Sequence, residues 1–174
     1  RRLDAHFEGL RALGIEVTGG ANYVFRRRAL HGTDLVLDEA SVTATENILM
    51  AAVLAPGATT IFNAACEPHV QELCRLLNQM GARIRGIGTN LLRLEGVDSL
   101  HGATQRVQPD LIEIGSYIAA AAVTGGELLV RDICPDQAAI VARAAVRSPA
   151  TSNASPGCHA AGAAAGPSRR WRRG

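Results

Sequence analysis

The strongest constraint on the fold is that short segments recur in the same order, 67 to 70 positions further along the chain. Residues 14–17 (GIEV) reappear as residues 81–84 (GARI), and residues 30–32 (LHG) reappear as residues 100–102. The other matches are residues 43–46 with 110–113, 51–54 with 119–122, and 66–68 with 133–135. A spacing of this kind indicates successive copies of one supersecondary unit. We therefore predict two repeat units, residues 1–67 and 68–140.

Each repeat unit is predicted to mix helices with strands, which indicates an α/β (α+β) fold class. The second helix is expected to begin at Thr43, with Glu46 completing a capping box. Pro68 suits the first turn of the next helix. The predicted helices are residues 3–13, 43–56 and 68–81 and one that starts at Asp110; the predicted strands are residues 15–18, 23–27, 34–37, 59–62, 83–85, 91–95, 104–107 and 127–131.

The tail, residues 145–174, differs in composition from the rest of the chain. It contains five Arg, eight Ala and no acidic residue, whereas all 16 acidic residues lie at or before Asp136. Such a segment buries too little apolar surface to offset its ordering entropy, so we expect disorder. We interpret the tail as an out-of-frame translation of GC-rich DNA. The alternative is a basic tether for nucleic acid or a membrane.

Composition excludes several classes of chemistry within this chain. All 18 basic residues are Arg, so Schiff-base and lysine general-base chemistry are excluded. No apolar run reaches the roughly 18 residues that span a bilayer, and we expect no membrane partner. The four cysteines form no C-x-x-C pair, so neither a metal site nor a disulfide framework is predicted. We expect Cys66, Cys74 and Cys134 to be buried, reduced thiols, as in a cytoplasmic protein.

Five distributed motifs follow one another along the first 116 residues. They are R-x-x-D-x-H-x-x-G-L-x-x-L-G (residues 1–14), S-V-x-A-T-E-N (41–47), N-A-A-x-E-P (63–68), L-E-G-V (94–97) and P-D-x-I-E-x-G-S (109–116). Together they resemble the UDP-N-acetylglucosamine 1-carboxyvinyltransferases, a branch of the enolpyruvyl transferase family. The resemblance covers residues 1–140, which correspond to about a third of such an enzyme.

This resemblance implies a fold of inside-out α/β barrel domains, each built from three βαβαββ units, of which about two are present here. It implies transfer of enolpyruvate from phosphoenolpyruvate to the 3-hydroxyl of UDP-N-acetylglucosamine, the first committed step of peptidoglycan synthesis. No cofactor and no metal are implied. The family's catalytic Cys lies a few residues before the position of Arg1, so we expect no catalytic residue in this chain and no activity from the chain alone.

The resemblance also implies which residues contact substrate. Arg1 matches a family Arg that contacts the phosphate of phosphoenolpyruvate, and a planar cation suits that group. Two segments match contacts to the uridine nucleotide. The first consists of Arg1, Arg2, Leu3, Asp4 and Ala5, and the second consists of Glu39, Ala40, Ser41 and Val42. Ser41 has a structural alternative as a helix cap, and the two roles are compatible because a helix N-terminus favours phosphate.

Other polar residues have both a structural and a functional interpretation. Glu67 precedes Pro68 and is predicted to cap a helix or to pair with an Arg, with lining of the substrate site as the alternative. Asp110 and Glu113 are interpreted as a helix cap and its capping-box partner, again with a site-lining role as the alternative. His31 and His101 occupy equivalent turns of the repeat, which favours turn residues over metal ligands.

Two other functions compete with the sugar-nucleotide transferase. One is an enzyme of the same fold that acts on shikimate 3-phosphate, in the manner of 5-enolpyruvylshikimate-3-phosphate synthase. The motifs at residues 63–68 and 110–116 argue against it. The other is a non-catalytic remnant whose basic tail binds nucleic acid, which would show strong salt dependence. We do not expect nucleic acid as a partner.

Overall fold

The computed structural model describes residues 3–126, 128–130 and 169–171 of the chain. The chain divides into two compact units, unit 1 (Arg1–Gln105) and unit 2 (Arg106–Gly174). Both contain helices and strands, which confirms the predicted mixed class. Among the described residues, no helix combines the length and the apolar character needed to cross a membrane.

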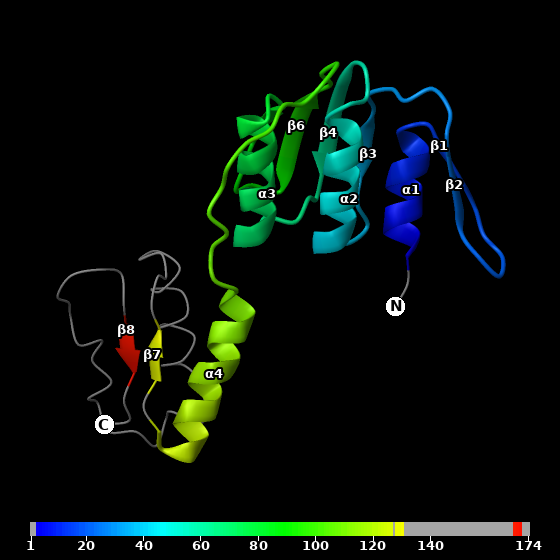
Figure 1. Cartoon of the computed structure of the whole chain (residues 1–174). Coiled ribbons are helices and arrows are strands. Elements are labelled where there is room, and N and C mark those ends of the chain that lie inside the picture. Colours follow the sequence, from blue (N-terminus) through cyan, green and yellow to red (C-terminus); the bar gives the residue numbers. More distant parts are fainter. Residues whose placement is uncertain (1–2, 127, 131–168, 172–174) are drawn as a thin grey trace. The chain divides into compact units, whose positions relative to one another are not determined.

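Unit 1 starts with a helix and a hairpin and continues as a sheet with two helices (Figure 1). Its elements are α1 (Asp4–Ala12), β1 (Ile15–Thr18), β2 (Val24–Arg27), β3 (Asp34–Val36), α2 (Val42–Ala52), β4 (Ala58–Phe62), α3 (Pro68–Gln79), β5 (Arg83–Arg85) and β6 (Leu91–Glu95). Strands β1 and β2 form a separate antiparallel pair. Pro68 occupies the first turn of α3, as predicted, because a missing N–H is harmless there.

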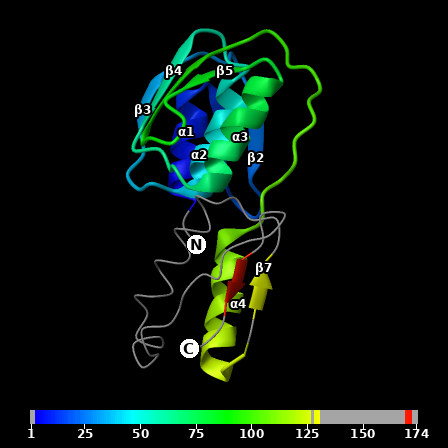
Figure 2. The same ribbon diagram turned by 90° about the vertical axis from the view of Figure 1, so that its left-hand side faces the viewer.

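Four strands form one sheet in the order β3-β4-β6-β5. Strands β3 and β4 are parallel and are connected through α2, whereas β4–β6 and β5–β6 are antiparallel. Figures 1 and 2 show α2 and α3 stacked against one face of this sheet. The parallel pair requires a crossover connection, and a helix is the usual solution. Both strands therefore end, and both following helices begin, at the same edge of unit 1.

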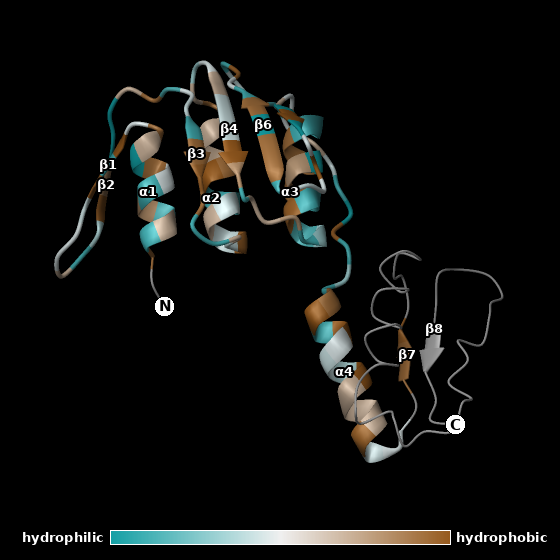
Figure 3. Ribbon diagram, turned by 180° about the vertical axis from the view of Figure 1, so that it is seen from behind, coloured by the Kyte–Doolittle hydropathy of each residue, from teal (hydrophilic) through white to brown (hydrophobic). Residues whose placement is uncertain are grey.

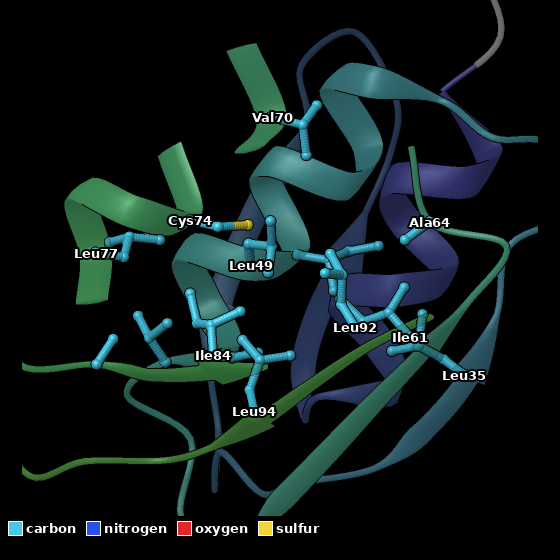
Figure 4. Packing of buried hydrophobic residues seen from close by; sticks show 14 of the residues in the cluster. Leu35, Leu49, Ile61, Ala64, Val70, Cys74, Leu77, Ile84, Leu92 and Leu94 are labelled. Carbon is cyan, nitrogen blue, oxygen red and sulfur yellow. The ribbon is translucent and has the colours of Figure 1, made fainter. Parts of the chain in front are cut away.

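The core of unit 1 lies between the sheet and these two helices (Figure 4). Leu49 of α2 and Cys74 of α3 face Ile61 and Leu92 of the sheet, and all four side chains are buried. Figure 3 shows apolar, brown segments in β3, β4 and β6, although each strand also contains polar residues, such as Asp34, Thr59 and Arg93. No aromatic residue belongs to the buried core of the described residues, so branched aliphatic side chains fill it. This composition agrees with the low aromatic content of the chain, 3%.

Helix α1 lies against α2 because Gly9 leaves room for Ile48. A Cβ atom on Gly9 would lie 2.2 Å from Ile48 Cδ1. The other side of α1 carries Phe7, whose ring centroid lies 4.9 Å from that of Tyr23 and 6.1 Å from that of Phe25. A two-stranded hairpin is marginally stable by itself, so these aromatic contacts with α1 help to hold β1 and β2.

The backbone at Gly14 has the same kind of geometry as the backbone at Gly81, 67 positions later. Their φ values are 90° and 104°, in the left-handed region that favours glycine after a helix. The amide of His31 donates to Leu13 O at 3.2 Å, and the amide of His101 donates to Met80 O at 2.9 Å. Both histidines therefore sit in turns that return to the end of a helix.

Three predictions for unit 1 require correction. Helix α2 begins at Val42, one residue earlier than expected, and its cap is Ser41 in place of Thr43, because Ser41 Oγ accepts from the Ala44 amide. Glu46 consequently lies beyond the first turn and completes no capping box. Residues 104–107 form no strand, because no neighbouring strand of the described residues pairs with them. Cys66 is exposed, whereas Cys74 is buried as predicted and Cys134 lies outside the described residues.

Unit 2 contains helix α4 (Leu111–Thr124) and an antiparallel pair of strands, β7 (Leu128–Val130) and β8 (Arg169–Trp171). Ile114 and Ile118 of α4 are buried against Leu128 and Val130. Strand β8 comprises three residues of the tail. The rest of the tail lies outside the described residues, so both its disorder and its out-of-frame origin stay predictions.

We predict that Gly14→Ala destabilises unit 1 by about 2 kcal/mol or more, since a side chain there has positive φ and steric conflict. The new Cβ would lie 2.2 Å from Ala29 O. Gly81→Ala should cost less, about 1 kcal/mol, because its nearest neighbour is His101 at 3.3 Å. Gly20→Ala, which meets nothing within 4 Å, is the control. Urea unfolding measures all three, and equal midpoints for Gly14→Ala and Gly20→Ala would contradict the fold.

The Cys74 thiol provides a second prediction. Burial raises the pKa of Cys74 from 9.0 to about 11, with a smaller opposing effect from Arg75. The protonated thiol therefore contributes fully to stability below about pH 9, and this contribution is lost as the pH rises to about 11. Stability of the wild-type chain should fall more steeply over this range than that of Cys74→Ala, as measured by urea unfolding at each pH. Iodoacetamide at pH 8 should label Cys66 well before Cys74, and equal labelling would be the contrary result.

Candidate functional site

Three helices begin at one end of unit 1, where strands β3 and β4 end (Figure 1). The first turns of α1, α2 and α3 place their outermost backbone amides at this end. Helix N-termini carry a partial positive charge and unpaired N–H groups, so the arrangement favours an anionic ligand. The same end holds the described part of both predicted nucleotide-contact segments.

His6 joins the first turns of α1 and α2. Its Nδ1 lies 2.9 Å from Asn47 Nδ2, and its Nε2 lies 3.3 Å from Thr43 Oγ1. An amide nitrogen is a donor, so His6 Nδ1 accepts, and the ring proton on Nε2 is directed to Thr43. These two bonds connect the segment that contains Leu3, Asp4 and Ala5 with the start of α2.

The second predicted segment lies in the loop between β3 and α2. Glu39 and Ala40 are exposed, whereas Ser41 and Val42 are partly buried. Ser41 is a cap, because its Oγ accepts from the Ala44 amide at 3.4 Å. The structural interpretation of Ser41 is therefore confirmed, and its side chain also faces the end of α2 where an anion would bind.

The other residues predicted to contact or line the site do not lie at the starts of α1 and α2 in the described residues. Glu67 precedes α3 at the same end of unit 1, is exposed, and makes no side-chain capping bond. In unit 2, Asp110 caps α4 through a bond of 2.8 Å to the Ile112 amide, as predicted. Glu113 lies in the first turn of α4 but makes no reciprocal capping bond among the described residues. Arg1 and Arg2 lie outside the described residues.

The described residues offer few groups for covalent or metal chemistry. No cluster of three or more His, Cys, Asp or Glu in the described ranges is arranged to hold a metal ion. Cys74 is buried, and its raised pKa disfavours the nucleophilic thiolate. Cys66 is exposed just before α3. The end of unit 1 where the three helices begin is therefore suited to binding an anionic ligand.

Asn63 and Thr45 belong to the quoted motifs but were assigned no role from the sequence, and both support the loop between β3 and α2. Asn63 adopts a φ of 56°, and its Nδ2 donates to Leu37 O at 2.9 Å. Thr45 Oγ1 donates to Ser41 O at 2.8 Å and accepts from the Ala65 amide at 3.0 Å. An Asn directly after a strand is a signal for the left-handed conformation, but the bond partners of both residues depend on tertiary structure.

Comparison with known proteins identifies the family. Residues 1–150 match the sequence profile described as EPSP synthase (3-phosphoshikimate 1-carboxyvinyltransferase). A UDP-N-acetylglucosamine 1-carboxyvinyltransferase of Porphyromonas gingivalis is 55% identical over 136 residues, which are 76% of this chain and 31% of the relative. The protein of the same name from Treponema denticola is 56% identical over 135 residues, which are 78% of this chain and 32% of the relative. The chain thus spans about a third of these relatives.

Solved structures show the same fold at lower sequence identity. The enolpyruvyl transferase NikO from Streptomyces tendae gives a TM-score of 0.68 at 19% identity, over 82% of this chain and 37% of that protein. EPSP synthase from Acinetobacter baumannii gives a TM-score of 0.59 at 24% identity, over 76% of this chain and 31% of that protein. The profile match covers most of the chain, and the folds agree. The chain therefore belongs to the EPSP synthase family of enolpyruvyl transferases.

Proposed function

We propose that this chain is part of a UDP-N-acetylglucosamine enolpyruvyl transferase and carries part of its sugar-nucleotide site. The observation that carries the proposal is the position of the two predicted contact segments. They are far apart in sequence, yet they flank the adjacent N-termini of α1 and α2, which His6 joins. The named relatives support the choice of sugar nucleotide, since those at 55% and 56% identity are UDP-N-acetylglucosamine 1-carboxyvinyltransferases.

The diphosphate of the nucleotide is the group that this end of unit 1 suits. Two helix dipoles and their first-turn amides stabilise negative charge without a lysine, which the chain lacks. The uridine nucleotide would contact Leu3, Asp4 and Ala5 of the first segment. Arg1 and Arg2, which belong to the same segment, would add further contacts to it. The second segment, Glu39 to Val42, would contact the nucleotide from α2. Arg1 would also contact the phosphate of phosphoenolpyruvate, because a guanidinium pairs well with phosphate oxygens.

The reaction is an addition followed by an elimination that releases phosphate. It requires a general acid for the enol carbon and a base for the 3-hydroxyl of the sugar. Cys66 and Cys74 do not lie in a loop that matches the family's catalytic Cys, so we propose that this chain binds substrate but does not catalyse turnover alone. We propose that this reaction is the first committed step of peptidoglycan synthesis. The free thiols of Cys66 and Cys74 support the cytoplasm as the compartment.

We further propose that the repeat corresponds to the βαβαββ units of an inside-out barrel domain. The order β3-α2-β4-α3-β5-β6 has this form and supplies one complete sheet. The matching backbone at Gly14 and Gly81 supports α1-β1-β2 as the end of a preceding unit. Two ion pairs add support. Glu16 of β1 pairs at 2.7 Å with Arg28, which follows β2, and 67 positions later Arg83 of β5 pairs at 3.5 Å with Glu95 of β6, with the signs exchanged.

Binding of the nucleotide tests the proposal directly. Titration of the ¹⁵N-labelled chain with UDP-N-acetylglucosamine should shift the amide signals of residues 3–5 and 39–44 saturably, and shikimate 3-phosphate should not. Ser41→Asp retains a capping side chain but places a charge against the diphosphate, so its affinity should fall by about tenfold. Ser41→Asn retains the cap without the charge and should bind like the wild type.

The same titration separates the competing functions. Saturable shifts with shikimate 3-phosphate, and none with the sugar nucleotide, would favour the enzyme that acts on shikimate phosphate. Shifts with neither ligand would refute the proposal. Binding of a DNA duplex that weakens steeply with salt and disappears when residues 145–174 are deleted would favour the remnant with a basic tail.

A further inference from the structure

The loop between β3 and α2 (residues 37–41) carries three of the four residues proposed to contact the nucleotide on this side. Its middle residues, Asp38 to Ala40, are exposed. The Ser41 amide donates to Glu39 O at 2.7 Å, which indicates a tight turn within the loop. An exposed loop of this length has many accessible conformations, and ordering it on binding would reduce the affinity.

Asn63 supports the first end of this loop from the neighbouring strand. It follows β4 directly, and its Nδ2 donates to Leu37 O at 2.9 Å. The Leu37 amide donates to Phe62 O at 3.1 Å, so Leu37 is bonded through both its N–H and its C=O. The φ of 56° at Asn63 turns the chain after β4, and asparagine adopts this conformation more readily than most residues.

Thr45 supports the other end of the loop from within α2. It is fully buried, and its Oγ1 uses both its donor and its acceptor capacity. The donor bonds to Ser41 O at 2.8 Å, and the acceptor receives the Ala65 amide at 3.0 Å. The start of α2 is thereby connected to the loop that precedes α3. Loss of the hydroxyl would leave the buried Ala65 amide without its acceptor, which is costly, whereas Ser41 O would keep its bond from the Thr45 amide at 3.0 Å.

Helix α4 of unit 2, the counterpart of α2 in the proposed repeat, forms without a comparable hydroxyl. The residue 67 positions after Thr45 is Ile112. Thr45 follows Ser41, the cap of α2, at the same spacing as Ile114 follows Asp110, the cap of α4. Neither side chain has a hydroxyl, although α4 forms and is capped by Asp110. Asn63 directly follows β4, whereas the residue that directly follows β7 in the sequence is Arg131, which has no side-chain amide. The two polar side chains are therefore specific to the part of the chain that carries the proposed nucleotide contacts.

We propose that Thr45 and Asn63 are positioning residues, which hold residues 37–41 in the shape that binds the sugar nucleotide. This inference rests on the proposed function. Neither side chain is proposed to contact the ligand. Each acts by bonding to the backbone at one end of the loop. Pre-organisation of this kind raises affinity because the loop is already ordered before the ligand arrives.

Matched substitutions test the inference in the full chain. Thr45→Val keeps the branched shape and removes the hydroxyl, whereas Thr45→Ser keeps the hydroxyl. We expect Thr45→Val to bind UDP-N-acetylglucosamine about tenfold more weakly, and Thr45→Ser to restore affinity to near the wild-type value. Amide hydrogen exchange at residues 38–41 should accelerate by about tenfold in Thr45→Val, while exchange in β4 and β6 stays unchanged.

Asn63→Gly provides an independent variant should Thr45→Val not fold. Glycine accepts the positive φ at this position but removes the amide that bonds to Leu37 O. The same loss of affinity and faster exchange at residues 38–41 are expected. If the wild type binds and both folded variants bind equally well, the positioning role is refuted and the proposed function stands. If the wild-type chain does not bind the nucleotide, the proposed function fails, and the positioning role fails with it.

Discussion

The parallel pairing of β3 with β4 is the interaction on which the rest of unit 1 depends. Parallel neighbours cannot be joined by a tight turn, so α2 must cross back over the sheet between them. This crossover places the ends of both strands and the beginnings of α2 and α3 at one edge. The buried face formed by Leu49, Ile61 and Leu92 supports the arrangement. An end of unit 1 that is suited to an anion is thus a consequence of strand direction before any side chain is considered.

Side chains then convert this general geometry into a defined loop. Thr45 belongs to the buried part of α2, yet its hydroxyl bonds to the backbone of Ser41, where the exposed loop joins the helix, and of Ala65, before α3. His6 has a comparable role between α1 and α2, since it bonds to Thr43 and Asn47. Core packing and the proposed binding loop are therefore connected through the first turn of α2. A substitution that disturbs core packing near Ile48 should also disturb the loop, because the same helix carries both.

The sequence predicted the local features well, but it does not specify which strands pair. Pro68, Gly14 and Gly81 mark helix ends through the backbone angles they allow, and such signals are local. The start of α2 was misplaced because Ser41 and Thr43 are equally suitable caps, and only the structure selects between them. Residues 104–107 have strand-like composition, but a strand also needs a partner, which composition does not specify. The bonds of Asn63 and Thr45 were missed for the same reason, since their partners come from other elements.

The position of these contacts determines which parts of the chain the proposed binding requires. His6, Thr45 and Asn63 and all the backbone groups to which they bond lie between Leu3 and Ala65 of unit 1. The basic tail begins 80 residues later in the chain, at residue 145. The reading frame of the tail therefore does not affect the groups that hold the loop of residues 37–41. Turnover is a separate matter, because addition and elimination need an acid and a base in addition to a bound nucleotide.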